Sequence, residues 1–202
     1  MSNPHASLDK DKAILRTAAL AARDALSGAH RTAAAQAIAT RGLPFAIIPG
    51  TIIAGYAPIR SEIDPIPLMQ NLAARGARLA LPAVVARDAP LTFRVWSAGD
   101  KLLRGPLGIL EPSPESAEIV PDIVLVPLAA FDRSGHRIGY GAGHYDRTLA
   151  QLRTSKPVTA KPVTAIGIAF AIQEIDDIPA LPHDAALDYV LTEAQMLDFR
   201  SS

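Results

Sequence analysis

Hydrophobic positions in the first fifth of the chain recur at helical spacing. Apolar residues return every three or four positions between Asp9 and Leu26, which predicts an amphipathic helix. A second helix is predicted from Arg31 to Arg41, with Ser27 as its N-terminal cap and Gly42 placed to end it. We therefore expect the chain to begin with two helices.

After this helical part, short β-branched and apolar runs predict strands. The expected strands cover residues Thr51–Tyr56, Arg78–Leu81, Leu91–Trp96, Ile123–Val126, Ala165–Ala169 and Leu187–Leu191. The last three are the continuous apolar type found in strands that are covered on both faces. Between them, Asp64-Pro65 predicts the start of a helix that ends near Gly76, and another helix is expected from about His144 to Leu152.

The alternation of helices and strands predicts an α/β fold with a largely parallel sheet and the N-terminal helices packed outside it. Near the end of the chain, Thr192 and Gln195 have the spacing of a capping box, which predicts a last short helix. The pentamer Lys-Pro-Val-Thr-Ala occurs twice in tandem, at 156–160 and 161–165, and its two prolines predict a surface loop.

Composition narrows the function classes. The 202 residues carry 20 Lys plus Arg and 20 Asp plus Glu, so no basic excess favours a nucleic acid or an anionic membrane as partner. The chain has no cysteine, which excludes disulfides, cysteine-bound zinc and a thiolate nucleophile. No apolar run reaches the ~18 residues of a membrane span, and Met1–Lys12 lacks the apolar core of a signal peptide. We expect one cytoplasmic domain over residues 1–202.

The segment from Pro127 to Arg147 is the most informative for chemistry. A buried strand ends at Pro127, and Gly139, Gly141 and Gly143 then alternate before the helix at His144. Alternate glycines let backbone N–H groups turn toward one point, and a helix N-terminus adds partial positive charge there. This arrangement is suited to phosphate, although it matches neither the Walker nor the Rossmann spacing.

Charged residues next to these glycines favour a nucleotide and a metal ion. Arg137 precedes the glycines and Arg147 follows them. Asp146 would repel a polyphosphate unless it holds Mg²⁺. The alternative is that the glycines form only a tight turn and that Asp146 offsets the helix dipole.

Three further places are weaker candidates. Lys12 and Arg16 share one helix face, where they either reach a phosphate or are simply solvated. Glu62 follows a strand end, a usual place for ligand contacts in α/β sheets, but it equally suits a surface acid. His183-Asp184 offers either a metal carboxylate or a turn.

Taken in order, these segments resemble the 5-formyltetrahydrofolate cyclo-ligase family over nearly the whole chain. The matching segments are Lys12–Arg16, Tyr56 with Ser61-Glu62, Gly108–Pro112, Pro127–Arg147, Ile166-Gly167 with Phe170 and Gln173, His183-Asp184 and Leu187-Asp188. The resemblance implies a three-layer α/β/α fold similar to that of sugar-phosphate isomerases and CoA transferases. It also implies ATP- and Mg²⁺-dependent conversion of 5-formyltetrahydrofolate to 5,10-methenyltetrahydrofolate, with release of ADP and phosphate.

The resemblance also implies roles for particular residues. Those expected to bind ATP are Lys12, Arg16, Arg137, Gly139, Tyr140, Gly141, Ala142, Gly143, His144 and Tyr145. Arg137 and Asp146 are the expected catalytic residues, Asp146 and Asp184 the magnesium ligands, and Tyr56, Glu62 and Tyr140 the folate contacts. We expect a monomer or weak homo-oligomer.

Two positions depart from the commonest loop of the family, Gly-Gly-Gly-Tyr-Tyr-Asp. Ala142 replaces a glycine and adds only a methyl group, so phosphate binding should persist. His144 replaces a tyrosine and is expected to alter a substrate contact or the pH dependence. The alternatives to the cyclo-ligase are a noncatalytic folate- or nucleotide-binding protein and a sugar-phosphate isomerase on the same fold.

Overall fold

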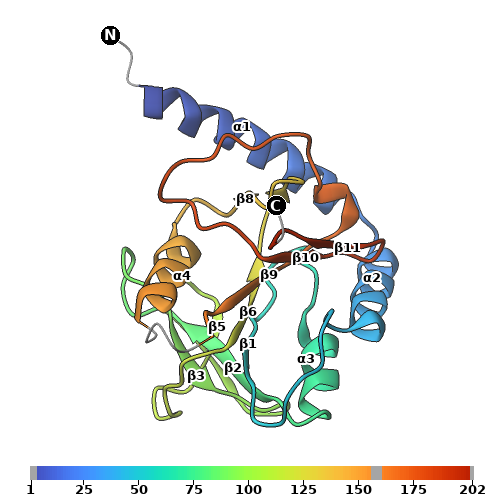
Figure 1. Ribbon diagram of the computed structural model, residues 1–202, viewed down its shortest axis with the longest axis vertical. Helices are drawn as coiled ribbons and strands as arrows, with labels where there is room; N and C mark the ends of the chain where they lie inside the picture. The colour runs from blue at the N-terminus through green and yellow to red at the C-terminus, as the bar shows by residue number, and fades with distance from the viewer. Residues whose placement is uncertain (1–3, 156–160, 201–202) are drawn as a thin grey trace.

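A mostly parallel sheet forms the centre of the computed structural model, which describes residues 4–155 and 161–200. Its seven strands lie in the order β11-β10-β9-β6-β1-β2-β3 (Figure 1). They span β1 Ile52–Ala54, β2 Arg78–Ala83, β3 Thr92–Val95, β6 Ile123–Pro127, β9 Thr164–Ile168, β10 Tyr189–Leu191 and β11 Met196–Asp198. The five strands from β10 to β2 pair in parallel, and β3 and β11 pair antiparallel at the edges.

Helices cover both faces of this sheet, which confirms the expected three-layer α/β/α architecture. On one face lie α2 (Gly28–Arg41) and α3 (Ile66–Ala73), on the other α4 (His144–Ser155). The first helix, α1 (Pro4–Asp24), runs across one end of the sheet (Figure 1). There its Ala19 packs with Ala129 and Ile138.

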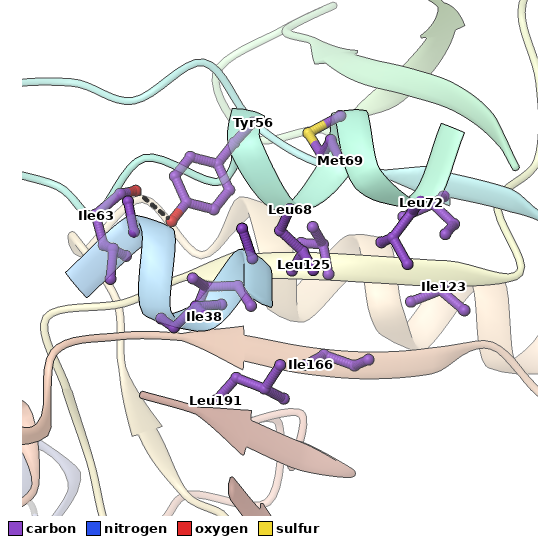
Figure 2. Packing of buried hydrophobic residues seen from close by; sticks show 14 of the residues in the cluster. Ile38, Tyr56, Ile63, Leu68, Met69, Leu72, Ile123, Leu125, Ile166 and Leu191 are labelled. Atoms are coloured by element: carbon purple, nitrogen blue, oxygen red, sulfur yellow. Dashed lines mark hydrogen bonds between the residues drawn. The ribbon is translucent and has the colours of Figure 1, made fainter. Parts of the chain in front are cut away.

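Alternation along the strands divides the core between the two faces. Figure 2 shows Ile38 of α2 and Leu68 of α3 facing Leu125, Ile166 and Leu191 of the sheet. The residues between them on these strands point to the opposite face, where Leu149 and Leu152 of α4 cover them. The central strand β6 is therefore buried on both sides, as its apolar run predicts.

The predicted helix boundaries have identifiable chemical causes. Ser27 caps α2, since its Oγ accepts the His30 N–H at 3.1 Å, and Gly42 ends that helix with a positive φ of 70°. The Asp64 carboxylate accepts the Ile66 N–H at 2.9 Å at the start of α3. These local signals predicted the helix ends because each acts within three residues.

Two predictions near the C-terminus are wrong. Thr192 and Gln195 form the turn of the β10–β11 hairpin instead of a helix cap, and Thr192 Oγ1 accepts the N–H groups of Ala194 at 3.2 Å and Gln195 at 3.0 Å. The first copy of the pentamer lies outside the described residues. The second copy is not wholly a surface loop, because Val163 is buried and β9 begins at Thr164.

Two small hairpins complete the described part of the chain, and neither was predicted. One pairs β4 (Leu102–Arg104) with β5 (Leu110–Pro112), and the other pairs β7 (Ala130–Phe131) with β8 (Arg137–Ile138). A short 3₁₀ helix, η1, spans Ala171–Gln173. None of the helices in the described part of the chain has the length and apolar character that a membrane span requires.

Candidate active site

A cavity of about 870 Å³ lies at the carboxyl ends of the central parallel strands. Tyr56 follows β1, Val84 follows β2 and Pro127 ends β6, and all of them line this cavity. Ligands of open α/β sheets bind at this edge. The cavity wall also contains all the site residues expected from the sequence, namely Lys12, Arg16, Tyr56, Glu62, Arg137, Gly139, Tyr140, Gly141, Ala142, Gly143, His144, Tyr145, Asp146 and Asp184.

The glycine segment, residues 139–143, joins β8 to the N-terminus of α4. Gly141 and Gly143 have φ values of 96° and 65°, a region that side chains rarely adopt. A Cβ on Gly143 would also lie 2.8 Å from Nη1 of Arg147. The glycine segment thus has the backbone of an anion-binding turn, with the α4 N-terminus directly after it.

Helix α1 contributes cations to the same place. Arg16 donates from Nε to the Gly139 carbonyl oxygen at 2.7 Å, so it contacts the glycine segment directly. Lys12, one turn earlier, is buried and pairs with Asp184. The structure therefore favours the site over simple solvation for both residues. Arg147 also lines the cavity, and it donates to the carbonyl oxygen of Ala142 at 2.6 Å, which braces the glycine segment.

Each aspartate expected to bind magnesium is paired with a cation. Asp146 Oδ1 accepts from Nη2 of the buried Arg137 at 2.7 Å, and from the Ala185 N–H at 3.1 Å. Asp184 pairs with Lys12 and accepts the Leu181 N–H at 2.7 Å. Burial raises the pKa of Asp184, but these two hydrogen bonds together with the charges of Lys12 and His183 outweigh it and lower the pKa below its ordinary value.

The two aspartates fit a magnesium ion that is also bound by phosphate. Ala185, the residue after Asp184, holds Asp146, so both carboxylates belong to one corner of the cavity. Among the described residues, no group of three or more His, Cys, Asp or Glu could form a complete protein cage for a metal. Mg²⁺ commonly takes one or two carboxylates plus substrate phosphates, and this pair suits that pattern.

A second part of the cavity wall, after β1, is less polar. The buried Glu62 accepts the Ile59 N–H at 2.8 Å and a hydrogen bond from Tyr140. Burial raises the pKa of Glu62 above its ordinary value, although these hydrogen bonds and Arg23 oppose the shift. Tyr56 donates its hydroxyl to the Ile63 carbonyl oxygen at 2.9 Å (Figure 2), and its buried side chain both packs in the core and lines the cavity.

Arg23 is a site-related residue that sequence reasoning missed. It is 2 % exposed, donates from Nε to Ser61 Oγ at 3.0 Å and from Nη1 to the Tyr140 hydroxyl, and lies behind the cavity wall. Its spacing was an available signal. Lys12, Arg16 and Arg23 stand at positions i, i+4 and i+11, which places all three on one helix face.

His144 lines the cavity, but its ring is hydrogen-bonded to a different loop. Its Nδ1 lies 3.1 Å from the Ala89 carbonyl oxygen, in the loop after β2, while its Nε2 is buried without a hydrogen-bond partner among the described residues. The histidine at this position, where the commonest family loop has a tyrosine, therefore connects α4 to the loop after β2. Its expected effect on substrate or pH dependence stays a prediction.

Comparison with known proteins identifies the family. The family model for 5-formyltetrahydrofolate cyclo-ligases matches residues 8–193. The chain belongs to the 5-formyltetrahydrofolate cyclo-ligase family. This confirms the resemblance drawn from the sequence and identifies the chain as a member of a ligase family.

Relatives and solved structures extend along nearly the whole chain. A 5-formyltetrahydrofolate cyclo-ligase of Mycolicibacterium smegmatis is 38% identical over 193 residues, covering 91% of this chain and 94% of its own. The Escherichia coli cyclo-ligase is 29% identical, covering 88% and 97%. The solved 5,10-methenyltetrahydrofolate synthetase of Aquifex aeolicus has a TM-score of 0.74 at 27% identity, covering 95% and 94%. That of Mycoplasma pneumoniae has a TM-score of 0.68 at 27% identity, covering 91% and 99%.

Proposed function

We propose that the protein catalyses ATP- and Mg²⁺-dependent cyclisation of 5-formyltetrahydrofolate to 5,10-methenyltetrahydrofolate, releasing ADP and phosphate. The observation that carries this proposal is that one cavity joins an anion-binding glycine segment to a less polar wall with a buried carboxylate. The first part suits the phosphates of ATP, and the second suits a flat heterocycle with N–H groups. Family membership supports the same substrates.

The chemistry requires activation of an oxygen. The N-formyl group is an amide, whose oxygen is a poor leaving group. In the proposed reaction this oxygen attacks the γ-phosphorus of ATP, and the bond to ADP breaks. N10 of the folate then attacks the formyl carbon and loses its proton, and the C–O bond breaks to release phosphate. The reaction therefore consumes one ATP and one 5-formyltetrahydrofolate and forms one methenyl product, one ADP and one phosphate.

This sequence needs no protein nucleophile. Phosphoryl transfer depends mainly on positioning and on neutralising charge. Lys12, Arg16 and Arg137 bring cations to the cavity, and the N–H groups of the glycine segment are available to phosphate oxygens. Asp146 and Asp184 would hold Mg²⁺, which supplies neutralisation of the phosphate charge when bound. Glu62, Tyr56 and Tyr140 would orient the folate so that its formyl oxygen meets the γ-phosphate.

Occupation of the site requires the cation–carboxylate pairs to change partners. In the structure Lys12 pairs with Asp184, and Arg137 pairs with Asp146. A nucleotide that takes both cations leaves both carboxylates facing phosphate. Asp146 and Asp184 would then hold Mg²⁺, whose charge would offset that repulsion, so we infer that nucleotide and metal bind together.

The test is a direct assay. Purified protein is mixed with 5-formyltetrahydrofolate, ATP and Mg²⁺, and the near-ultraviolet absorbance of the methenyl product is followed. The proposal expects a rise that requires all three components, with one ADP formed per product. Binding of both ligands without product would identify a noncatalytic binding protein. Isomerisation of a sugar phosphate without ATP would identify the alternative enzyme and overturn the proposal.

A further inference from the structure

Glu111 is a buried carboxylate in the cavity that the mechanism above does not use. It lies on β5, is 6 % exposed and lines the cavity. Its Oε1 accepts the Val84 N–H at 3.2 Å, just after β2. Gly105 passes so close that a Cβ there would lie 2.2 Å from Oε1 of Glu111. The β4–β5 hairpin thus makes room for this carboxylate, which a side chain at position 105 would displace.

The protein leaves this carboxylate largely uncompensated. Across residues 4–155 and 161–200, Val84 supplies its single hydrogen-bond donor and no cation pairs with it. The cavity wall around it is apolar, formed by Pro82, Val84, Leu107 and Ile109. A buried carboxylate is costly unless donors satisfy its oxygens. Glu111 does not figure among the described residues with a fully buried, unpartnered polar atom, so its second oxygen faces the cavity, where a bound ligand can donate to it in place of water.

The position of Glu111 indicates which ligand. Glu62 follows β1, while Glu111 is held at the end of β2, the neighbouring strand. Parallel neighbours lie about 4.8 Å apart. Glu62 also bonds to Tyr140 of the glycine segment, whereas Glu111 has no contact with that segment among the described residues. Glu62 therefore lies nearer to the expected phosphate site, and Glu111 contacts the part of a flat ligand that is farther from it.

We propose that Glu111 determines folate specificity by accepting the adjacent N–H groups of the pteridine pyrimidine edge, the 2-amino group and N3–H. This rests on the proposed function. A carboxylate matches two adjacent donors in a bidentate pair. The edge of adenine presents a donor beside a ring-nitrogen acceptor, which a carboxylate repels. The pairing therefore assigns Glu111 to the folate and leaves Glu62 near the reacting side of the ring.

The test compares wild type with Glu111→Gln in equilibrium binding, without turnover. Calorimetry gives Kd for 5-formyltetrahydrofolate in the absence of ATP, and separately for ATP with Mg²⁺. The variant is expected to bind the folate at least tenfold more weakly and ATP with unchanged Kd. Unchanged folate affinity, or an equal loss for ATP, overturns the proposal. The glutamine keeps an oxygen for the Val84 N–H, so a merely structural role of Glu111 predicts unchanged affinity.

A ligand variant makes the assignment specific. The 2-desamino analogue of the substrate should bind wild type at least tenfold more weakly than the substrate itself. The affinity of this analogue for Glu111→Gln should be little weaker than its affinity for wild type, because both changes remove the same hydrogen-bonded pair. If the affinity losses from the variant and from the analogue instead multiply, the assignment of Glu111 to the 2-amino and N3–H edge is overturned.

A control variant separates binding from stability. Asp132 is equally buried, accepts backbone N–H groups of Ser134 and His136, and lies outside the cavity. Asp132→Asn is expected to lower Tm while keeping the folate Kd. If Asp132→Asn loses as much folate affinity as Glu111→Gln does, the proposed role of Glu111 is contradicted. If wild type makes no methenyl product, the proposed function fails. If it makes product and Glu111→Gln binds folate normally, only this inference fails.

Discussion

At the scale of single residues, the site is organised by local pairing of charge. The whole sequence has equal numbers of basic and acidic residues, 20 of each. In the cavity, Arg137 and Lys12 are both buried and each faces one aspartate. Although the net charge of the whole chain is zero, cationic side chains are therefore concentrated in the cavity, where a small anion would bind.

The pair of Asp146 with Arg137 gives the first prediction. Asp146→Asn keeps an oxygen for the Ala185 N–H but removes the negative charge that is proposed to bind Mg²⁺. We expect kcat to fall about 100-fold or more, in the range typical of losing one electrostatic contact in an active site. Half-maximal activity should require more Mg²⁺, measured as initial rates of methenyl formation across a magnesium titration.

Asp188 provides the matched control for this variant. It also pairs with an arginine, Arg153, at 3.3 Å and accepts a backbone N–H, that of Ala165, at 2.7 Å, but it does not line the cavity. Asp188→Asn should lower Tm and leave kcat near wild type. An Asp146→Asn enzyme with wild-type turnover would refute the metal and catalytic roles.

Glu62 gives a prediction about pH. Its pKa is raised mainly by burial, so the folded state binds the proton more tightly than the unfolded chain does. The stabilising contribution of Glu62 is therefore full at low pH and is lost as pH rises through the folded-state pKa. Glu62→Gln removes this titration. The Tm of the variant minus that of wild type should become more positive from pH 4 to pH 8, measured by thermal unfolding in one buffer series.

The same variant should lose activity, because the proposed folate contact of the Glu62 carboxylate is removed. A Tm difference that stays constant or falls as pH rises would contradict the proposed burial of this charge.

At the scale of elements, α1 joins distant parts of the site through one face. Lys12 reaches Asp184, Arg16 reaches Gly139, and Arg23 reaches Ser61 and Tyr140. The first two line the cavity, whereas Arg23 lies behind it. We therefore expect Arg23 to act as a positioning residue through Tyr140.

We expect Arg23→Gln to raise KM for the folate about tenfold, with a smaller change in kcat and in KM for ATP. The reason is that Tyr140 loses the donor that holds its hydroxyl beside Glu62. The double variant with Tyr140→Phe should lose less than the product of the two single losses, since both belong to one network. Steady-state kinetics of the four proteins measures this.

Arg41 offers a comparison on the next helix. It donates to the carbonyl oxygens of Thr192 and Glu193, away from the cavity. Arg41→Gln should reduce Tm without changing either KM. Equal effects of Arg23→Gln on both KM values would indicate general loosening of the fold rather than positioning of Tyr140.

Sequence predicted those elements whose signals are local or periodic. The helices α1 to α4 and the buried strands follow from period, caps and apolar runs. The Thr192–Gln195 pattern misled because a threonine oxygen accepts the same N–H groups in a turn as in a helix cap. Pairing of the following residues with β10 decided between the two, and the four-residue capping pattern carries no information about that pairing. The β4–β5 hairpin was missed for a related reason, since its strands are only three residues each.

For the site as well, the sequence predicted the residues whose signals are local and missed those that folding brings together. The glycine segment and its flanking charges are contiguous, and the structure places all of the expected residues around one cavity. Arg23 was missed because burial of a cation depends on Tyr140 and Ser61, which are far away in sequence. Glu111 was missed as a site residue because only folding brings β5 to the end of β2.

At the scale of the whole molecule, the cavity lies between α1, α4 and the ends of three sheet strands, so ligand binding should stabilise the fold. A ligand at 100 times its Kd adds about 2.7 kcal/mol to the free energy of unfolding. For a chain of this size each kcal/mol raises Tm by about 2–4 °C. We therefore expect a non-hydrolysable ATP analogue with Mg²⁺ to raise Tm by about 5–10 °C, measured by scanning calorimetry.

The dependence of this shift on magnesium tests the arrangement of charge. Without Mg²⁺ the analogue takes Lys12 and Arg137 from their aspartates and leaves both carboxylates facing phosphate, so the same analogue concentration should raise Tm by less. In Asp146→Asn one of those carboxylates is neutral, and the difference between measurements with and without Mg²⁺ should shrink. A wild-type shift that is independent of Mg²⁺ would mean that the nucleotide binds elsewhere or leaves both ion pairs intact.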